Sequence, residues 1–342
     1  MRRAGTCRPP RPPGAGRRHL RIRTGPRRAA RKATIHLAIK LEFAGQGLPR
    51  CYGREIPRWS TNDKDSDRHR RSRGHGKLAT AKILGSDHRV VITDVNRQRL
   101  DAAAAELRDH GVDAAAVACD ITSRASVEAL FQQADREGSV RAVVHTAGIS
   151  PQMGTADKII RINALGTVNI TEAALAVATE GFALVNLASI AGHMTPRLVI
   201  PKRIFRLALT DRDRFTAKLA AGASRAPKGM RPGLAYSLSK NFVIWYSQQI
   251  AAPFGAKGAR VLSVSPGSFD TAMGRLEEKS GSGKLTGYAA LKRYGRPEEI
   301  AELLAFCAGD KPGYLTGVDI LCDGGTKAGL DLKGMIAMAR GD

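Results

Sequence analysis

The sequence predicts an α/β fold with a doubly wound parallel sheet in a single domain, and two observations support this. Beyond about residue 76, short apolar segments alternate with helical segments, which is typical of parallel strands joined by crossover helices. Several apolar segments also end on Asp, Gly or Ser, so polar groups lie where such sheets bind ligands. No apolar run reaches about 18 residues, so no membrane span is expected.

The expected elements follow one another closely along the chain. The first half contains helices at 77–84, 97–110 and 126–136 and strands at 89–94, 114–120 and 142–148. The second half contains helices near 161–169 and 234–250 and strands at 182–189, 259–265 and about 315–325. This order predicts a sheet that binds ligands at the carboxyl ends of its strands.

The net charge of +24 is distributed unevenly along the chain. The first 76 residues hold 21 Lys and Arg against 5 Asp and Glu, whereas the other 266 hold 34 against 26. Total charge is therefore a poor guide to the partners of the folded domain. The five cysteines are scattered without a Cys-x-x-Cys pair, so neither a metal site nor a disulfide framework is expected, and a reducing cytoplasm is favoured.

Residues 1–73 form a basic segment rich in Arg, Pro and Gly, a composition that favours disorder. A nucleic-acid-binding tail lacks support because no aromatic residues are interleaved with the basic ones. A targeting peptide would be unusually long and poor in Ser. We favour out-of-frame translation of a GC-rich coding sequence, and we expect no nucleic-acid partner. The stretch 34–43 alternates like a strand but has no evident partner within this segment.

An acidic residue closes the strand predicted at 89–94. Asp94 lies 18–20 residues beyond Gly74 and Gly76, where a carboxylate would bind a ribose 2′-hydroxyl. Because a carboxylate repels a 2′-phosphate, NAD is favoured over NADP. The alternative is an aspartate that only stabilises a solvated turn.

Two further strand ends suit a dinucleotide. Asp120 follows a buried strand and is placed to contact an adenine ring. Ala147 and Gly148 follow the next strand, and a glycine allows the backbone to approach a cofactor closely.

Tyr236 and Lys240 are four residues apart on the predicted helix 234–250, which places them one turn from each other. The pKa of a phenol is normally near 10, and a neighbouring ammonium group favours the phenolate and lowers it. The pair is therefore a plausible acid/base device, although the same spacing is common by chance.

From residue 74 to residue 326 the chain resembles the short-chain dehydrogenase/reductase family, which has a Rossmann-type fold. The family has a Thr-Gly-x-x-x-Gly-x-Gly loop between its first strand and first helix, and the last two glycines match Gly74 and Gly76. The preceding strand would then be residues 63–69, which are too charged for a central buried strand. The first strand is therefore expected to be missing or replaced.

The resemblance also implies a catalytic set. Asn163 matches the family's asparagine that holds a proton-relaying water, and Ser189 matches the serine that binds the substrate oxygen. Tyr236 would exchange the proton with the substrate, while Lys240 would lower the pKa of the phenol and hold the nicotinamide ribose. Each assignment has a purely structural alternative. Ser189 could simply form a turn at a strand end, and Asn163 could be a helical asparagine whose side chain bonds the backbone.

The resemblance extends to the nicotinamide side of the site. Pro266 and Gly267 match the family's turn after the sixth strand, and Thr271 matches a threonine that contacts the carboxamide. Nicotinamide cofactors carry the redox chemistry in such enzymes.

One departure from the simpler family members is an insertion at about 193–230. Ser189 and Tyr236 are 47 residues apart, and residues 197–228 hold nine Lys and Arg against two Asp. Its apolar residues predict one or two amphipathic helices: Leu198, Ile200, Ile204, Phe205, Leu207, Leu209, Phe215 and Leu219. We interpret it as a lid that favours a bulky hydrophobic or acidic substrate. The alternative is a solvated basic face without a role in selectivity.

The sequence thus predicts an NAD(H)-dependent oxidoreductase that interconverts a secondary alcohol and a ketone, with Tyr236 as acid/base. The alternative is a catalytically impaired remnant that acts only as a folded or interaction module, because the glycine loop is incomplete. The resemblance further implies a homo-oligomer.

Overall fold

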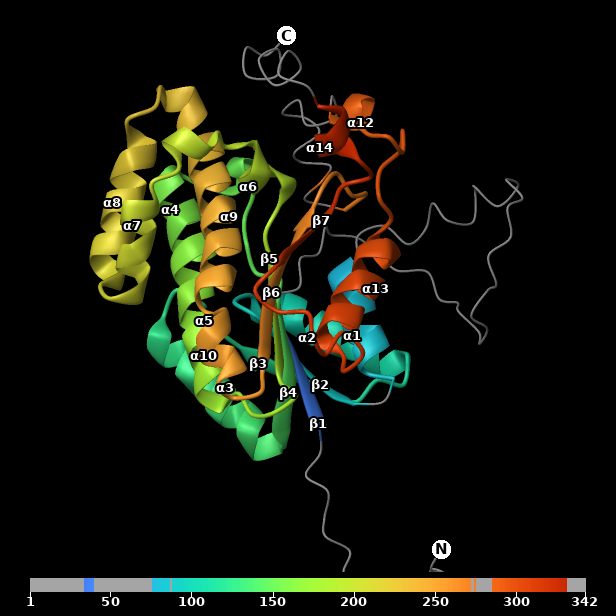
Figure 1. Ribbon diagram of the computed structural model, residues 1–342. Helices are drawn as coiled ribbons and strands as arrows, with labels where there is room; N and C mark the ends of the chain where they lie inside the picture. The colour runs from blue at the N-terminus through green and yellow to red at the C-terminus, as the bar shows by residue number, and fades with distance from the viewer. Residues whose placement is uncertain (1–33, 40–75, 87, 272–273, 275–284, 331–342) are drawn as a thin grey trace, which may run out of the picture. The chain divides into compact units, whose positions relative to one another are not determined.

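The computed structural model describes residues 34–39, 76–86, 88–271, 274 and 285–330. All of them belong to one compact unit, Ala33–Asp342. At its centre is a seven-stranded sheet with the order β3-β2-β1-β4-β5-β6-β7 (Figure 1). Every pairing is parallel, which confirms the predicted fold class. The strands are β1 (Thr34–Ile39), β2 (Arg89–Asp94), β3 (Ala114–Ala118), β4 (Ser139–His145), β5 (Ala183–Leu187), β6 (Arg260–Pro266) and β7 (Asp319–Cys322).

The central strand β1 comes from the basic segment 1–73, from the stretch for which the sequence suggested no partner. It pairs with β2 on one side and with β4 on the other, so that Leu37 stands opposite both Val91 and Val143. The first strand is therefore replaced and not missing. Its partners lie outside the segment 1–73, because parallel partners are joined by long crossover connections and lie far away in sequence. Residues 40–75, including Gly74, lie outside the described part of the chain.

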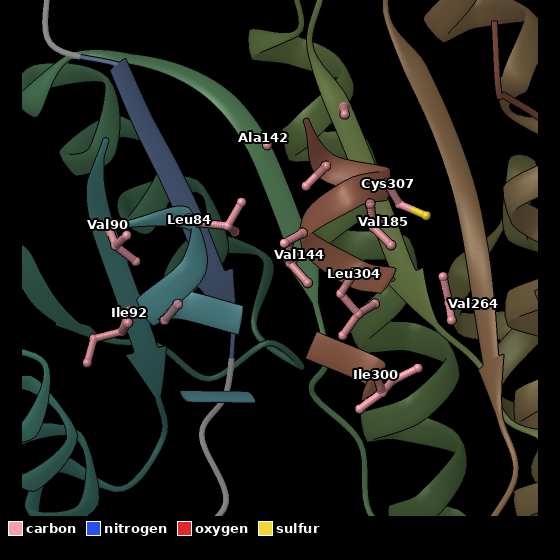
Figure 2. Packing of buried hydrophobic residues seen from close by; sticks show 14 of the residues in the cluster. Leu84, Val90, Ile92, Ala142, Val144, Val185, Val264, Ile300, Leu304 and Cys307 are labelled. Atoms are coloured by element: carbon pink, nitrogen blue, oxygen red, sulfur yellow. The ribbon is translucent and has the colours of Figure 1, made fainter. Parts of the chain in front are cut away.

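One face of the sheet is covered by α1 (Gly76–Leu84), α2 (Arg97–Asp109) and α13 (Pro297–Ala308). Alternate strand residues point toward this layer, as the period of two requires. Val90 and Ile92 of β2 pack with Leu84, and Val144 and Val185 belong to the same cluster as Leu304 (Figure 2). These side chains are almost fully buried.

The opposite face is covered by α3 (Arg124–Glu137), α5 (Gly166–Val177), α9 (Arg231–Gln249) and α10 (Ala251–Gly255). The intervening strand residues, among them Val91 and Val143, pack with Phe131 and Ile170. Ser123 caps α3 because its hydroxyl accepts from the backbone N–H of Ser126 at 3.3 Å, which satisfies a donor at the helix start.

The insertion forms two α-helices, α7 (Lys202–Phe205) and α8 (Arg212–Ser224), as expected. Of the apolar residues on which this prediction rested, Leu198 and Leu209 lie outside both helices and are exposed. Phe205, Phe215 and Leu219 are fully buried in a third cluster together with Phe242 of α9. The ring centroids of Phe215 and Phe242 are 4.5 Å apart. The inner side of the insertion is therefore part of the hydrophobic core.

Short elements complete the described chain. They are η2 (Pro151–Met153), α4 (Ala156–Ile160), a π-helical turn η3 (Arg161–Leu165), α6 (Ile190–Met194), η4 (Arg197–Val199), η5 (Arg206–Leu209), η6 (Lys228–Met230), α12 (Leu285–Tyr288) and α14 (Thr326–Gly329). Within the described ranges, no helix combines the length and the apolar character needed to cross a membrane.

Candidate active site

The order in which the strands are added to the sheet reverses between β1 and β4. After β1 the chain continues to β2 and β3 on one side, and it then crosses to β4 on the other side. Ligands bind open parallel sheets at such a switch point, at the carboxyl ends of the strands. The loop after β4 contains Ala147 and Gly148, both buried, and it is followed by η2 and α4.

Asn163 fixes the loop after β4. It lies in the π-helical turn between α4 and α5 and is 1% exposed. Its Oδ1 atom accepts from the Ile149 N–H at 2.8 Å, and its Nδ2 atom donates to the Ile149 carbonyl at 3.0 Å. Nδ2 also lies 3.3 Å from the hydroxyl of Ser239. A π turn is a frequent local distortion at functional sites, and here it brings a buried amide to the loop.

Tyr236 and Lys240 occupy one face of α9, as their spacing predicts. Both are buried, and Lys240 Nζ lies 5.9 Å from the centre of the Tyr236 ring. Ser239 connects this turn to Asn163, because its hydroxyl donates to the Tyr236 carbonyl at 2.8 Å. A Cβ atom added to Gly148 would lie 3.3 Å from both Lys240 Nζ and Asn163 Oδ1, so these groups converge.

Lys240 also reaches the end of β5. Its Nζ donates to the carbonyl of Leu187 at 2.8 Å. Two residues later Ser189 caps α6, with its hydroxyl accepting from the Ala191 N–H at 3.2 Å. A lysine held by a strand-end carbonyl is thereby kept close to the predicted substrate-binding serine.

The helix α6 packs tightly against α9. A Cβ atom on Gly192 would lie 2.9 Å from the backbone of Lys240 and Asn241, so only glycine permits this approach. Asn241 Nδ2 donates to the Gly192 carbonyl at 2.8 Å. These contacts bring the segment that follows Ser189 against the turn that contains Lys240.

Asp94 closes β2 on the other side of the switch point. It is 2% exposed, and its Oδ1 atom accepts from the Asn96 N–H at 2.7 Å. Its Oδ2 atom is buried and has no hydrogen-bond partner within the described chain. A buried carboxylate oxygen with unused accepting capacity is costly unless a donor is supplied, and a ribose hydroxyl is such a donor.

The predicted nicotinamide turn follows β6. The Gly267 N–H donates to the Cys322 carbonyl at 2.9 Å, and an added Cβ would lie 2.7 Å from the Cα of Asp323. Close packing against the chain after β7 therefore requires a glycine next to Pro266. Thr271 accepts from the Gly274 N–H at 3.0 Å, which shows a turn contact for its hydroxyl.

Of the two remaining predicted cofactor residues, Asp120 differs from this picture and Gly76 fits it. Asp120 is exposed, and its Oδ1 atom accepts from both the backbone and the hydroxyl of Thr122, at 2.9 and 2.8 Å. Its described contacts are those of a turn. Gly76 is the first residue of α1, as expected of a helix that begins at a glycine loop.

The other tyrosine of this segment, Tyr246, has a different environment. It is 1% exposed and stacks on Phe242 with ring centroids 5.2 Å apart. Burial, and then the negative charge of Glu172, raises the pKa of Tyr246 well above its ordinary value. It is therefore a neutral core residue and provides a natural control for Tyr236.

Several contacts of the site were not anticipated from the sequence. The Leu187 carbonyl that binds Lys240 and the Ile149 backbone groups that bind Asn163 are main-chain atoms, and main-chain atoms leave no residue-type signal. Ser239 connects Asn163 to the Tyr236 carbonyl. Its position on the helix between Tyr236 and Lys240 is the one sequence feature that could have suggested this role.

Comparison with known proteins gives a consistent result. Residues 71–201 match the family model described as short chain dehydrogenase, and residues 216–327 match the model described as Enoyl-(Acyl carrier protein) reductase. Together the two matches cover well over half of the chain.

Individual relatives cover most of this chain. It is 26% identical over 271 residues to 3beta-hydroxysteroid dehydrogenase 2 of Eggerthella lenta, covering 75% of this chain and 91% of that protein. It is 28% identical over 265 residues to carbonyl reductase family member 4 of Xenopus tropicalis, covering 74% and 94%. A short chain dehydrogenase from Burkholderia cenocepacia, solved in complex with NADP, superimposes with a TM-score of 0.58 at 25% identity, covering 75% and 94%.

Proposed function

Because this chain belongs to the short-chain dehydrogenase/reductase family, we propose that it is an NAD(H)-dependent oxidoreductase that interconverts a secondary alcohol and a ketone. The observation that carries this proposal is the convergence of Asn163 and Lys240 on the loop at Gly148, with Tyr236 one turn before Lys240 on α9. Asn163 comes from η3 and the other two residues from α9, and the Ser239 hydroxyl connects them through Asn163 Nδ2 and the Tyr236 carbonyl.

In the proposed reaction, Tyr236 exchanges a proton with the substrate oxygen. The ammonium group of Lys240, 5.9 Å from the ring centre, stabilises the phenolate that results when the proton is given to a carbonyl. The hydroxyl of Ser189 donates a hydrogen bond to the same oxygen and steadies its developing charge. A bound nicotinamide supplies or accepts the hydride.

The residues at the strand ends fit an NAD molecule. The buried Oδ2 atom of Asp94 would accept a hydrogen bond from the adenosine ribose, and its charge disfavours a 2′-phosphate. Gly148 lies beside Lys240, and Gly267 lies beside the chain that follows β7. Neither glycine has a side chain that would keep a cofactor away from the backbone. These features support NAD over NADP for this chain.

The insertion supports a bulky apolar substrate more than an acidic one. Ile200, Ile204 and Leu234 are partly buried in the same cluster as Tyr236, so the inner side is apolar. The seven basic residues whose side chains are exposed take part in no ion pair among the described residues: Lys202, Arg203, Arg206, Arg214, Lys218, Arg225 and Lys228. On α8, Arg214 and Lys218 are exposed, whereas Phe215 and Leu219 are fully buried.

Replacing Tyr236 with Phe tests the proposal. NADH oxidation would be followed with a panel of ketones that includes steroid and aromatic ketones, for the wild type, Tyr236→Phe and the control Tyr246→Phe. We expect Tyr236→Phe to lower kcat by at least about 100-fold with NADH affinity retained, and the control to remain active.

Two results would count against this function. Turnover retained in Tyr236→Phe would refute the acid/base role. A wild-type protein that folds but binds no NADH would instead support the alternative, a catalytically impaired module.

A further inference from the structure

A buried polar cluster lies behind the candidate active site, between α6 and the strands β6 and β7. His193 Nε2 is 2.8 Å from Asp319 Oδ2 and 3.2 Å from Ser265 Oγ. The other carboxylate oxygen, Asp319 Oδ1, accepts from Ser263 Oγ at 2.5 Å and from Ser265 Oγ at 3.0 Å. None of these residues has a role in the proposed chemistry.

The carboxylate of Asp319 and its two serine partners are well protected from solvent. Ser263 and Ser265 are fully buried, and the side chain of Asp319 is 6% exposed. A carboxylate in such a place is stable only when donors surround it. Here it has two hydroxyl donors and one imidazole donor, so removing any one leaves a buried acceptor with fewer donors.

The proton on the imidazole can be assigned from its neighbours. Lys327 Nζ lies 3.4 Å from His193 Nδ1, and an ammonium group can only donate. Nδ1 is therefore the acceptor, and Nε2 carries the hydrogen that is directed at Asp319. The ring thereby bridges Lys327 on α14 and Asp319 on β7.

The arrangement is not that of a nucleophile and its base. In such a triad the serine and the acid meet different nitrogens of the imidazole, whereas Ser265 and Asp319 meet the same nitrogen. The hydroxyl of Ser265 is also directed at the carboxylate and is closed to solvent. The cluster therefore holds elements together and does not attack a substrate.

The elements that it joins carry both halves of the reaction. His193 lies four residues after Ser189 on α6, and Ser265 directly precedes Pro266 and Gly267. The other side of α6 is fixed by the contact of Gly192 with α9. We propose that His193 and Asp319 form a positioning latch that sets the distance between Ser189 and the Pro266–Gly267 turn.

This inference rests on the proposed function, because that function places the substrate oxygen at Ser189 and the nicotinamide at the turn. A hydride passes only between closely spaced and aligned atoms, and a misplacement of about 1 Å can cost about 100-fold in rate. His193 is accordingly a positioning residue that touches neither reactant.

The test compares His193→Leu, which removes the donor, with His193→Gln, which keeps an N–H donor at similar reach. His110→Leu is the matched control, because His110 is exposed at the end of α2, where its ring contacts the Glu106 carbonyl and Lys82 Nζ. The measurements are kcat, the dissociation constant of NADH, and the kinetic isotope effect with NADH deuterated at the transferred position.

We expect His193→Leu to lower kcat by about 10- to 100-fold and to raise the isotope effect, while the NADH dissociation constant changes by less than about twofold. His193→Gln should recover most of the rate, and His110→Leu should match the wild type. The latch is overturned if His193→Leu keeps the wild-type rate, if NADH binding falls in proportion to kcat, or if the glutamine does not rescue.

A measurement without cofactor separates this inference from the proposed function. Hydrogen exchange of the α6 amides, Ala191 to Met194, should become faster in His193→Leu and remain unchanged in His110→Leu. Unchanged exchange in His193→Leu would overturn the latch even in an active enzyme. Turnover retained in Tyr236→Phe would overturn the proposed function and leave the exchange result unaffected.

Discussion

The two sides of the switch point differ in how their polar groups are satisfied. On the proposed catalytic side, Asn163 bonds the Ile149 N–H and carbonyl and the Ser239 hydroxyl, and Lys240 is held by the Leu187 carbonyl. On the dinucleotide side, Asp94 keeps one buried carboxylate oxygen without a partner in the described chain. One side is pre-assembled, and the other retains capacity for a ligand.

This difference fits the demands on each side. Proton and hydride transfer need groups that are already held in place, since lost alignment cannot be recovered during the reaction. A side chain that binds a cofactor can keep an acceptor unpaired until the cofactor supplies the donor. We therefore expect mutations on the catalytic side to change stability and rate, and mutations at Asp94 to change mainly cofactor affinity and choice.

The largest effect is expected at the strand that both sides share. Leu37→Pro removes a backbone donor from β1, which has neighbours on both edges, and proline is not tolerated in a central strand. We expect loss of the cooperative unfolding transition, measured by circular dichroism on heating. The control Ala30→Pro lies upstream of β1, and a folded Leu37→Pro protein would contradict the placement of this strand.

The next largest effect is expected at Asn163. Asn163→Leu keeps the volume but leaves the buried Ile149 N–H and carbonyl without their partner, at a cost of about 1–3 kcal/mol for each unsatisfied group. The melting temperature and kcat should both fall. Asn169→Leu is a comparison on α5, where the amide is also buried but bonds the Ile121 carbonyl away from Tyr236. A loss of kcat equal to that of Asn163→Leu would contradict the special role of Asn163.

A smaller and more selective effect is expected at Asp94. Asp94→Ser removes the carboxylate that would bind the ribose and repel a 2′-phosphate. NADH affinity should fall about 10-fold or more, NADPH affinity should rise relative to it, and kcat at saturating cofactor should stay close to the wild type. Fluorescence titration with both cofactors measures this, and an unchanged preference would place Asp94 outside the cofactor site.

The smallest effect is expected at Glu299, in the first turn of α13. Hydrogen bonds from Arg293, opposed by desolvation and aided by the Arg296 N–H, lower the pKa of Glu299 from 4.5 to about 2. The folded state thus binds fewer protons, so this contribution to stability is complete above about pH 4.5 and is lost as the pH falls toward 2.

Glu299→Gln should therefore destabilise the protein at neutral pH, by less than about 1 kcal/mol because the pair is partly exposed. The difference from the wild type should shrink between pH 4.5 and 2 in thermal melts. A difference that grows on acidification would contradict this sign. Glu302→Gln, on the same helix and in no described ion pair, is the control.

The sequence was a good guide where the signal was local. The strand 89–94 and the helix containing Tyr236 and Lys240 were predicted from apolar runs and spacing. β1 could not be recognised as the central strand, because its partners lie beyond residue 88 and parallel pairing has no local signature. The contacts of Lys240 with Leu187 and of His193 with Asp319 join residues 53 and 126 positions apart, which no spacing rule anticipates.

NADH binding to the full chain is the decisive measurement. A domain whose first strand is Thr34–Ile39, with Asp94 and Gly148 at the neighbouring strand ends, should bind the cofactor beside Tyr236. Titration followed by NADH fluorescence should give a micromolar dissociation constant that Asp94→Ser weakens and Tyr236→Phe leaves largely unchanged. A folded wild-type protein that shows no binding at millimolar NADH would contradict the account.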